Sequence, residues 1–329
     1  MPETFAVTDA VELAVVERSG FVESRHAGSA IVLDPDGGVV SSLGAVEAAI
    51  LPRSALKPMQ ALASVSAGAH LEGAHLAVAT ASHSGTDRHV ALVTDILSAA
   101  GVAEDALLCP PSWPGDAAAR DEMTRELLGP QRVRMNCSGK HAAMLLACHV
   151  NGWDMATYLD PQHPLQVHTR EVVERLTGTK ITATAVDGCG APVHAMSLAA
   201  LARAVHRIGA SSERSPFALH RSAGALVRSV RENPWVIQGP GQPDSIVTER
   251  LGVFAKHGAE GVMSMVAPDG TTVVLKMLDG SNRAGVVTAL TLLVRAGALQ
   301  AADVARTLGE LPLTVAGGGR DVGVIRPTV

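Results

Sequence analysis

The sequence predicts an α+β fold in which a mainly antiparallel sheet is built from both ends of the chain. Two pairs of apolar runs carry this prediction, AIVLDPDGGVV at residues 30–40 and MVAPDGTTVVLKM at residues 265–277. In each pair a Pro-Asp-Gly turn separates the two runs, a pattern typical of a β-hairpin. Most long segments between the hairpins are rich in Ala and Leu with helical spacing. The middle of the chain should therefore form a largely helical insertion.

The other elements follow from the same patterns of apolar spacing. Further strands are predicted at residues 12–18, 21–27 and 322–326. Helices are predicted at residues 57–67, 88–100, 141–150, 165–176, 197–208, 215–231 and 282–297. A parallel doubly wound sheet is not expected, because strands and helices do not alternate strictly. We expect one catalytic unit over residues 1–329, with an α/β lobe at roughly 1–55 and 235–329 and a helical lobe at roughly 56–234.

Charge and apolar content argue against two classes of partner. The formal charge of -5 is spread without a basic stripe, so a nucleic-acid surface is not expected. No apolar run is long enough to span a bilayer, and the acidic N-terminal segment lacks signal-peptide features. We therefore expect a soluble cytoplasmic protein without membrane contact. In that reducing compartment Cys109, Cys137, Cys148 and Cys189 should serve metal binding, chemistry or packing instead of disulfides.

The segment RSALKPMQAL, residues 53–62, places Ser54 three residues before Lys57, one of five lysines in the chain. A helix would bring the two side chains onto one face, and Pro58 suits the first turn of a helix that begins at Lys57. A neutral amine can take the proton of a serine hydroxyl, provided that burial or another cation removes the charge of the amine. The pattern is common, so a surface lysine near a helix start is the alternative.

The segment ASHSGTDRHV, residues 81–90, follows an apolar run with a turn of small polar residues. Such turns often expose reactive side chains, and we expect Ser82 to point at a pocket. The alternative is that the polar residues cap the next helix, with Ser84 or Thr86 at its N-cap. Both roles can hold together. The Pro-rich stretch CPPSWPGD, residues 109–116, is either a loop near the active face or a crossing between the lobes.

Two tight turns carry cysteines that could bind a metal ion. In NCSGKHAAML, residues 136–145, Cys137 and Lys140 are three residues apart and a helix follows, with Asn136 or Ser138 as its expected cap. In DGCGAPVHAMSL, residues 187–198, Cys189 lies between two glycines. Two cysteines could share a zinc ion, but a complete site needs about four ligands, and a lysine ligand would have to be deprotonated. Two buried free thiols are the alternative.

The segment FAKHGAEGVMSM, residues 254–265, leads into the second hairpin. Its lysine, Lys256, precedes two glycines and a predicted buried strand. Nothing in this segment alone separates a catalytic lysine from a surface lysine.

Taken in this order, the five segments resemble the L-asparaginase II family of the Rhizobium etli inducible type. The resemblance runs from about residue 20 to residue 326 and includes the closing VAGGGRDVGVIRP. NCSGKH and ASHS are its specific motifs, and S-x-x-K supports them. It implies a fold similar to serine β-lactamases and glutaminases, with a sheet sandwiched between helices in three α/β/α layers. It also implies hydrolysis of L-asparagine to L-aspartate and ammonia by a homodimer.

The resemblance assigns roles to individual residues. It implies two serine–lysine pairs, Ser54 with Lys57 and Ser82 with Lys256, and a serine acyl-enzyme formed on Ser54. The zinc motif of the family falls on Cys137, Lys140 and Cys189, where the metal would assist substrate binding. Three weaker assignments to the substrate or the metal surroundings are Arg53, Asp187 and His141. Asp244 stands where some relatives carry a cysteine, which puts the substrate contacts at that point in doubt.

Two other functions stay open at this point. One is a glutaminase or another serine acyl-enzyme amidase, because one methylene group discriminates by only about 1–3 kcal/mol. The Ser-Asp-Asn and Lys-Thr-Gly motifs of β-lactamases and cell-wall enzymes are absent, which disfavours those activities. The other is a zinc-binding or amino-acid-binding protein that has lost catalysis, but both serines and both lysines are present.

Overall fold

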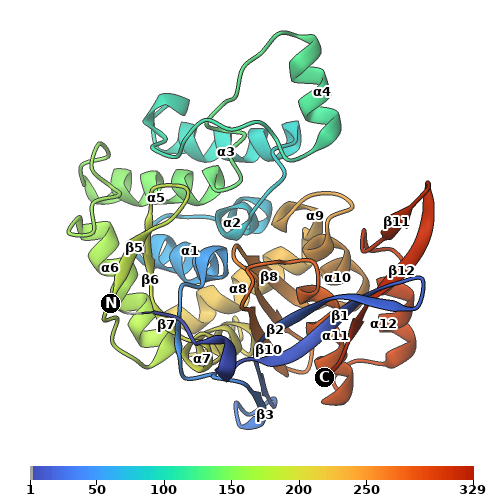
Figure 1. Cartoon of the computed structure of the whole chain (residues 1–329). Coiled ribbons are helices and arrows are strands. Elements are labelled where there is room, and N and C mark those ends of the chain that lie inside the picture. Colours follow the sequence, from blue (N-terminus) through green and yellow to red (C-terminus); the bar gives the residue numbers. More distant parts are fainter. Residues whose placement is uncertain (1–2) are drawn as a thin grey trace.

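The computed structural model describes residues 3–329 and centres on one antiparallel sheet. Its strand order is β11-β12-β1-β2-β10-β9-β8, and β3 also pairs with β2. The strands are β1 (Val11–Arg18), β2 (Phe21–Leu33), β3 (Val39–Leu43), β8 (Phe254–Gly258), β9 (Val262–Val266), β10 (Thr272–Met277), β11 (Val315–Gly317) and β12 (Arg320–Pro327). Strands from both ends of the chain lie side by side, blue against red in Figure 1, because β1 pairs with β12 and β2 with β10.

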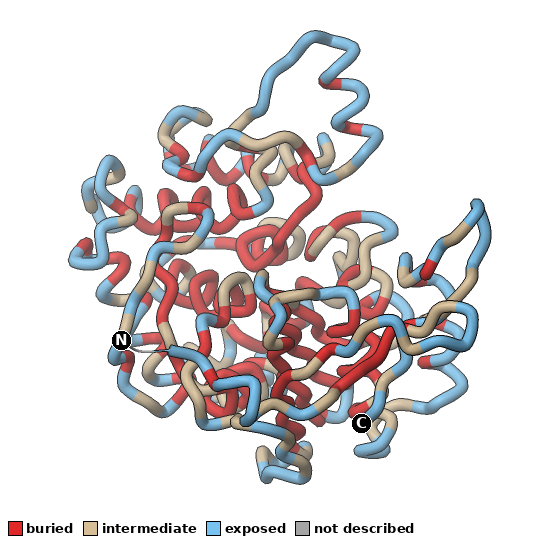
Figure 2. The backbone as a smooth tube through the Cα atoms, viewed as in Figure 1, coloured by how far each residue is buried: buried red, intermediate tan, exposed pale blue. Residues whose placement is uncertain are grey.

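Helices cover both faces of this sheet. Side chains alternate between the faces along a strand, so Ile31 and Leu33 of β2 join one apolar core and Ala30 and Val32 join the other. The first core includes α7 (Leu198–Gly209), and the second includes α11 (Gly285–Arg295) and α12 (Ala301–Leu308). In Figure 2 the buried residues, drawn in red, gather in the centre of the molecule, where the sheet and the helices meet. The predicted fold class, three layers around a mainly antiparallel sheet, is confirmed.

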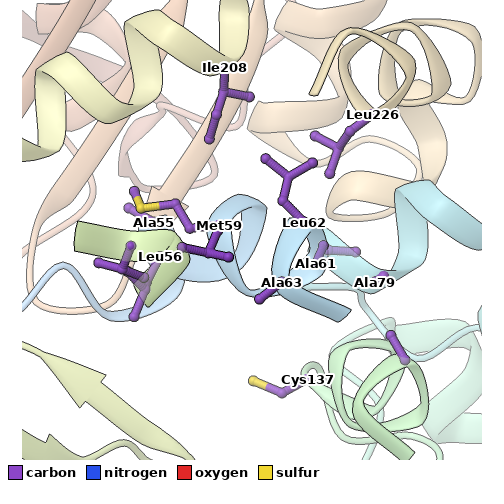
Figure 3. Close-up of a cluster of buried hydrophobic side chains, with 14 of the residues drawn as sticks. Ala55, Leu56, Met59, Ala61, Leu62, Ala63, Ala79, Cys137, Ile208 and Leu226 are labelled. Carbon is purple, nitrogen blue, oxygen red and sulfur yellow. The ribbon is translucent and has the colours of Figure 1, made fainter. Parts of the chain in front are cut away.

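The middle of the chain forms further helices. They are α1 (Lys57–Ser66), α2 (Gly73–Thr80), α3 (Asp87–Ala99), α4 (Ala117–Arg125), α5 (Ser138–Asn151), α6 (Pro164–Thr177), α8 (Ala218–Glu232), α9 (Pro234–Ile237) and α10 (Pro243–Leu251). All of these except α4 and α10 contribute side chains to the larger core, and Val247 of α10 belongs to the smaller one. Helix α1 is buried against α2, α5, α6 and α8. Figure 3 shows Met59 and Leu62 of α1 among side chains that include Ile208 and Leu226. Burying each such side chain stabilises the fold by about 1.5–3 kcal/mol, so the start of α1 is held firmly.

Short elements complete the chain. The 3₁₀ turns among residues 3–329 are η1 (Val7–Asp9), η2 (Arg53–Leu56) and η3 (Glu104–Ala106). Two small two-stranded sheets pair β4 (Ala49–Ile50) with β7 (Met196–Ser197) and β5 (Thr184–Val186) with β6 (Pro192–His194). In the part of the chain that the structure describes, no helix has both the length and the apolar content needed to cross a membrane.

Both predicted hairpins are present, as β2–β3 and β9–β10. The predicted helix start at Lys57, with Pro58 in the first turn, is also correct. The predicted caps are wrong in detail. Thr86 occupies the N-cap of α3, but its hydroxyl bonds the ring of His89 instead of the backbone. Cys137 precedes α5, without a side-chain cap from Asn136 or Ser138.

Candidate active site

The turn η2 presents Ser54 just ahead of Lys57. The N–H of Lys57 donates to the carbonyl oxygen of Ser54, and residues three apart in a 3₁₀ turn share one face. Ser54 is half-buried and Lys57 is buried. Arg53 has φ 50°, in the left-handed region that a residue with a β-carbon rarely adopts. Such strained residues collect at functional sites, where the surrounding structure holds them.

The amine of Lys57 is bonded inside the protein and not on its surface. It donates to the carbonyl oxygen of Ala81 at 2.7 Å, to Ser82 Oγ at 2.9 Å and to the carbonyl oxygen of Asn136 at 3.3 Å. These three acceptors match the three donors that an ammonium group carries. The alternative of a surface lysine at this position is therefore wrong.

Ser82 lies between the two lysines. Lys256 Nζ is also 2.9 Å from Ser82 Oγ, and it donates to the carbonyl oxygen of His257 at 2.7 Å. The structure thus brings Lys57, Ser82 and Lys256 into one buried chain of hydrogen bonds. Among residues 3–329, the hydroxyl of Ser54 forms no hydrogen bond with the amine of either lysine.

The two amines differ in their electrostatic surroundings. Burial lowers the pKa of Lys256 from 10.5 to about 7, with Asp244 opposing the fall and the charge of Lys57 adding to it. A substantial fraction of Lys256 is therefore neutral near pH 7. A neutral amine can accept a proton from the Ser82 hydroxyl while that oxygen accepts a hydrogen bond from Lys57.

The strand that carries Lys256 packs directly against the turn that carries Ser54. A Cβ added at Gly258 of β8 would lie 2.4 Å from the carbonyl oxygen of Pro52 and 3.2 Å from the N–H nitrogen of Ala55. Only glycine permits this close approach. Gly258 therefore determines how closely β8 approaches the turn that carries Ser54.

A cavity of about 300 Å³ opens beside the lysine–serine chain. Its lining comes from four loops and from β8, and it consists of Ser82, His83, Ser84, Ser112, Trp113, Gly115, Arg134, Met135, Asn136, Gln238, Gln242 and His257. Ser82 faces this pocket, as the sequence predicts. The Pro-rich loop at residues 109–116 supplies Trp113 to the wall, so it is a loop at the site.

Cys137, Lys140 and Cys189 meet in a second buried cluster. Lys140 Nζ lies 3.1 Å from Cys189 Sγ, and the Cys137 thiol donates to Asn136 Oδ1 at 3.0 Å. The hydrogen bond from Cys137 and the charge of Lys140 overcome burial and hold the pKa of Cys189 far below its ordinary value. Burial opposes the charge of Lys140, but the sulfur atoms and Asp187 raise its pKa to about 12. All four cysteines of the chain are free and buried.

The donors of this cluster suit zinc in their chemistry. Two thiols and an amine are soft or intermediate ligands, and His141 adds a buried Nε2 with no hydrogen-bond partner in the described chain. The other ring nitrogen of His141 lies 2.6 Å from the Tyr158 hydroxyl. Among residues 3–329, no group of three or more His, Cys, Asp or Glu side chains is arranged to hold a metal ion. The third donor would therefore be Lys140, after loss of its proton.

Arg53 and Asp187 form an ion pair instead of standing apart. Arg53 Nε is 2.6 Å from Asp187 Oδ1, and the other carboxylate oxygen lies 3.7 Å from Cys189 Sγ. This pair links the turn that carries Ser54 to the thiol cluster. Sequence reasoning singled out Asp244 but missed His257 and the pairing of the two, in which the buried carboxylate lies 2.7 Å from the His257 ring. The position of His257 directly after Lys256 was the only available signal.

Comparison with known proteins gives one strong result. The family model described as L-asparaginase II matches residues 14–327, nearly the whole chain. None of the curated proteins matches.

Solved structures give weaker likenesses. A β-lactamase from Mycobacterium bovis is 15% identical over 83% of this chain and 95% of its own, with a TM-score of 0.44. A putative β-lactamase from Bacteroides dorei is 13% identical over 78% and 86%, with a TM-score of 0.44. A Bacillus glutaminase is 12% identical over 82% and 91%, with a TM-score of 0.36. These values are too low to bear on the function of this chain.

Proposed function

Since the chain belongs to the L-asparaginase II family, we propose that this amidohydrolase converts L-asparagine to L-aspartate and ammonia through an ester on Ser54. One observation carries the proposal. The hydroxyl of Ser82 lies 2.9 Å from each of two buried amines, those of Lys57 and Lys256, and Ser82 borders a cavity of about 300 Å³. Such an arrangement can move a proton without water, which is what activation of a serine nucleophile requires.

The proton path follows the chain of hydrogen bonds. A neutral Lys256 can receive a proton that Lys57 passes on through the Ser82 hydroxyl, which leaves Lys57 neutral beside the face that carries Ser54. Lys57 then takes the proton of Ser54 as its oxygen attacks the side-chain amide carbon. General acid–base steps of this kind contribute about 10²–10⁴-fold each.

The relay then works in reverse. The tetrahedral intermediate collapses, its C–N bond breaks, and the relay returns a proton to the departing nitrogen, which leaves as ammonia. The oxyanion of the intermediate needs N–H donors. The N–H of Ser54 belongs to the first turn of η2 and has no backbone acceptor in the described chain, so it is the donor that we assign.

We also propose that Cys137, Lys140 and Cys189 bind zinc, with His141 beside them. When bound, zinc would supply a positive charge that attracts the carboxylate of the amino acid. Arg53 and Asp187 connect this cluster to η2 through their ion pair, so they keep Ser54 and the cluster in a fixed relation.

The test measures ammonia release from asparagine and from glutamine. The wild type should release ammonia, faster from asparagine, and Ser54→Ala should lose more than about 1000-fold in kcat. Ser66→Ala, at the end of the helix α1 that follows η2, is the control and should keep full turnover, because the Ser66 hydroxyl bonds Ala63 and His168 and neither lysine of the relay. Mass spectrometry of the wild type, quenched during turnover, should locate an aspartyl group on Ser54.

Each alternative predicts a different result. Faster release from glutamine would identify a glutaminase, and no release from either amide would refute the amidohydrolase proposal. An acyl group on Ser82 instead of Ser54 would overturn the choice of nucleophile. The homodimer stays a prediction, which light scattering at several protein concentrations tests.

A further inference from the structure

A buried pair, Asp244 and His257, lies beside the lysine–serine chain, and the proposed relay does not use it. Asp244 belongs to α10 and has no solvent exposure. Its Oδ2 accepts from the backbone N–H of His257 at 2.9 Å and lies 2.7 Å from Nδ1 of the same residue. Two contacts to one carboxylate oxygen fix both the strand and the ring at this point.

The carboxylate determines which ring nitrogen carries the proton. Burial alone would raise the pKa of Asp244, but the neighbouring His257 and Lys256 outweigh burial and lower the pKa to about 2. An ionised Asp244 only accepts, so Nδ1 of His257 must donate to it. In the neutral ring Nε2 then keeps its lone pair, and a carboxylate behind an imidazole is a known way to orient a base.

The free side of the ring belongs to the cavity. The side chain of His257 is 21% exposed and lines the same 300 Å³ space as Ser82. In the described part of the chain, Nε2 has no hydrogen-bond partner. The Lys256 amine contacts both the carbonyl oxygen of His257 and Ser82 Oγ, so this amine links His257 to the hydrogen-bonded chain of Lys57, Ser82 and Lys256.

Burying the carboxylate has a cost that this role explains. An ionised group without water must be compensated by its neighbours, and Oδ1 of Asp244 has no partner among residues 3–329. A purely structural position would be served by an uncharged side chain. The chain instead keeps a buried charge directly behind a histidine on the cavity wall.

We propose that His257 is a further acid–base residue of the hydrolysis, positioned by Asp244, and that it activates the water that cleaves the ester. The inference rests on the proposed function. Nε2 takes a proton from water as the water oxygen bonds to the acyl carbon. The C–O bond to Ser54 then breaks, its electron pair stays on Ser54 Oγ, and the proton on Nε2 passes to that oxygen. The products are L-aspartate and the free serine.

The test separates ester formation from ester cleavage in His257→Gln, which keeps a polar side chain but offers no base. Rapid-quench measurements with asparagine should show a burst of about one ammonia per active site, followed by turnover slower by about 10²–10⁴-fold. Intact mass should show the aspartyl ester accumulating. Hydroxylamine attacks esters without a general base, so adding it should restore turnover and release aspartyl hydroxamate. His70→Gln, at an exposed histidine with a side chain 88% accessible, is the control and should match the wild type.

Asp244→Asn tests the positioning role. An amide that donates to Nδ1 leaves the proton on Nε2, where it prevents the ring from acting as a base. The variant should accumulate the same ester and respond to hydroxylamine, while circular dichroism confirms that it folds. Rescue by hydroxylamine distinguishes this effect from general loosening of the site.

The outcomes separate the two proposals. Turnover of His257→Gln within about threefold of the wild type, or slow turnover without a burst and without ester, overturns the role of His257 and leaves the proposed function intact. A wild type that releases no ammonia from either amide overturns both. If His257→Gln does not fold, burst and ester in folded Asp244→Asn support the inference, and their absence overturns it.

Discussion

Replacing Lys256 by methionine tests whether a buried amine is neutral near pH 7. Lys256 is fully buried, and its pKa of about 7 lies well below the ordinary 10.5. Between these two values the unfolded chain binds more protons than the folded chain. The contribution of Lys256 to the free energy of unfolding must therefore rise with pH across this window, by at most about 1.4 kcal/mol per pH unit. Methionine is similar in length and does not titrate.

The quantity to follow is the difference in unfolding free energy between wild type and Lys256→Met. From pH 6 to pH 9 this difference should change by about 2.5 kcal/mol in favour of the wild type, from integration between the two pKa values. Any lost packing or hydrogen bonds shift the difference by a constant and cancel from its pH dependence.

Urea unfolding followed by circular dichroism at constant ionic strength gives the free energies. Lys180→Met is the control, because this side chain is 86% accessible and its amine pairs with Glu174 at the surface instead of being buried. Its difference from the wild type should stay flat from pH 6 to pH 9. An equally flat line for Lys256→Met would show that Lys256 stays charged in the folded protein, and the proton relay would fail with it.

Three further predictions concern activity and metal. The pH profile of kcat/KM should rise about tenfold per unit below pH 7 and level off above it, because the relay needs the neutral form of Lys256; a profile that falls with pH contradicts this role. Gly258→Ala should cost about 1–3 kcal/mol in urea unfolding and lower kcat, since its Cβ would displace Pro52 and the turn bearing Ser54. Gly129→Ala, where a Cβ would meet nothing within 4 Å, should spare kcat, and equal kcat in both variants refutes the contact argument. Purified wild type should contain zinc by elemental analysis, and Cys137→Ala and Cys189→Ala should contain much less; equal, negligible zinc in all three removes the metal proposal.

Local sequence patterns predicted the elements whose signals are strong. The Pro-Asp-Gly turns define both hairpins, and the apolar spacing of α5 and α7 defines buried helices. Other helices escaped notice for physical reasons. The α4 segment AAARDEMTR is mostly polar and exposed, so it lacks the apolar residues at helical spacing that predict a helix from sequence.

Contacts across the fold were beyond local patterns. Ser82 is 25 residues from Lys57 and 174 from Lys256, and no spacing rule places one hydroxyl between two such amines. Family resemblance proposed the two serine–lysine pairs but not the direct contact of Lys57 with Ser82. The pairing of Asp244 with His257 depends on the packing of α10 against β8, which the sequence does not reveal.

The position of β8 at the end of the sheet has a consequence for solubility. In the described chain β8 pairs with β9 on one side only, and an open strand edge invites pairing with another molecule. The turn η2 packs on a face of β8, because a Cβ at Gly258 would stand on that face and meet Pro52. Strand addition at the open edge would therefore act on the same strand that carries Lys256. Resistance to aggregation and placement of a buried amine are thus requirements on one short strand.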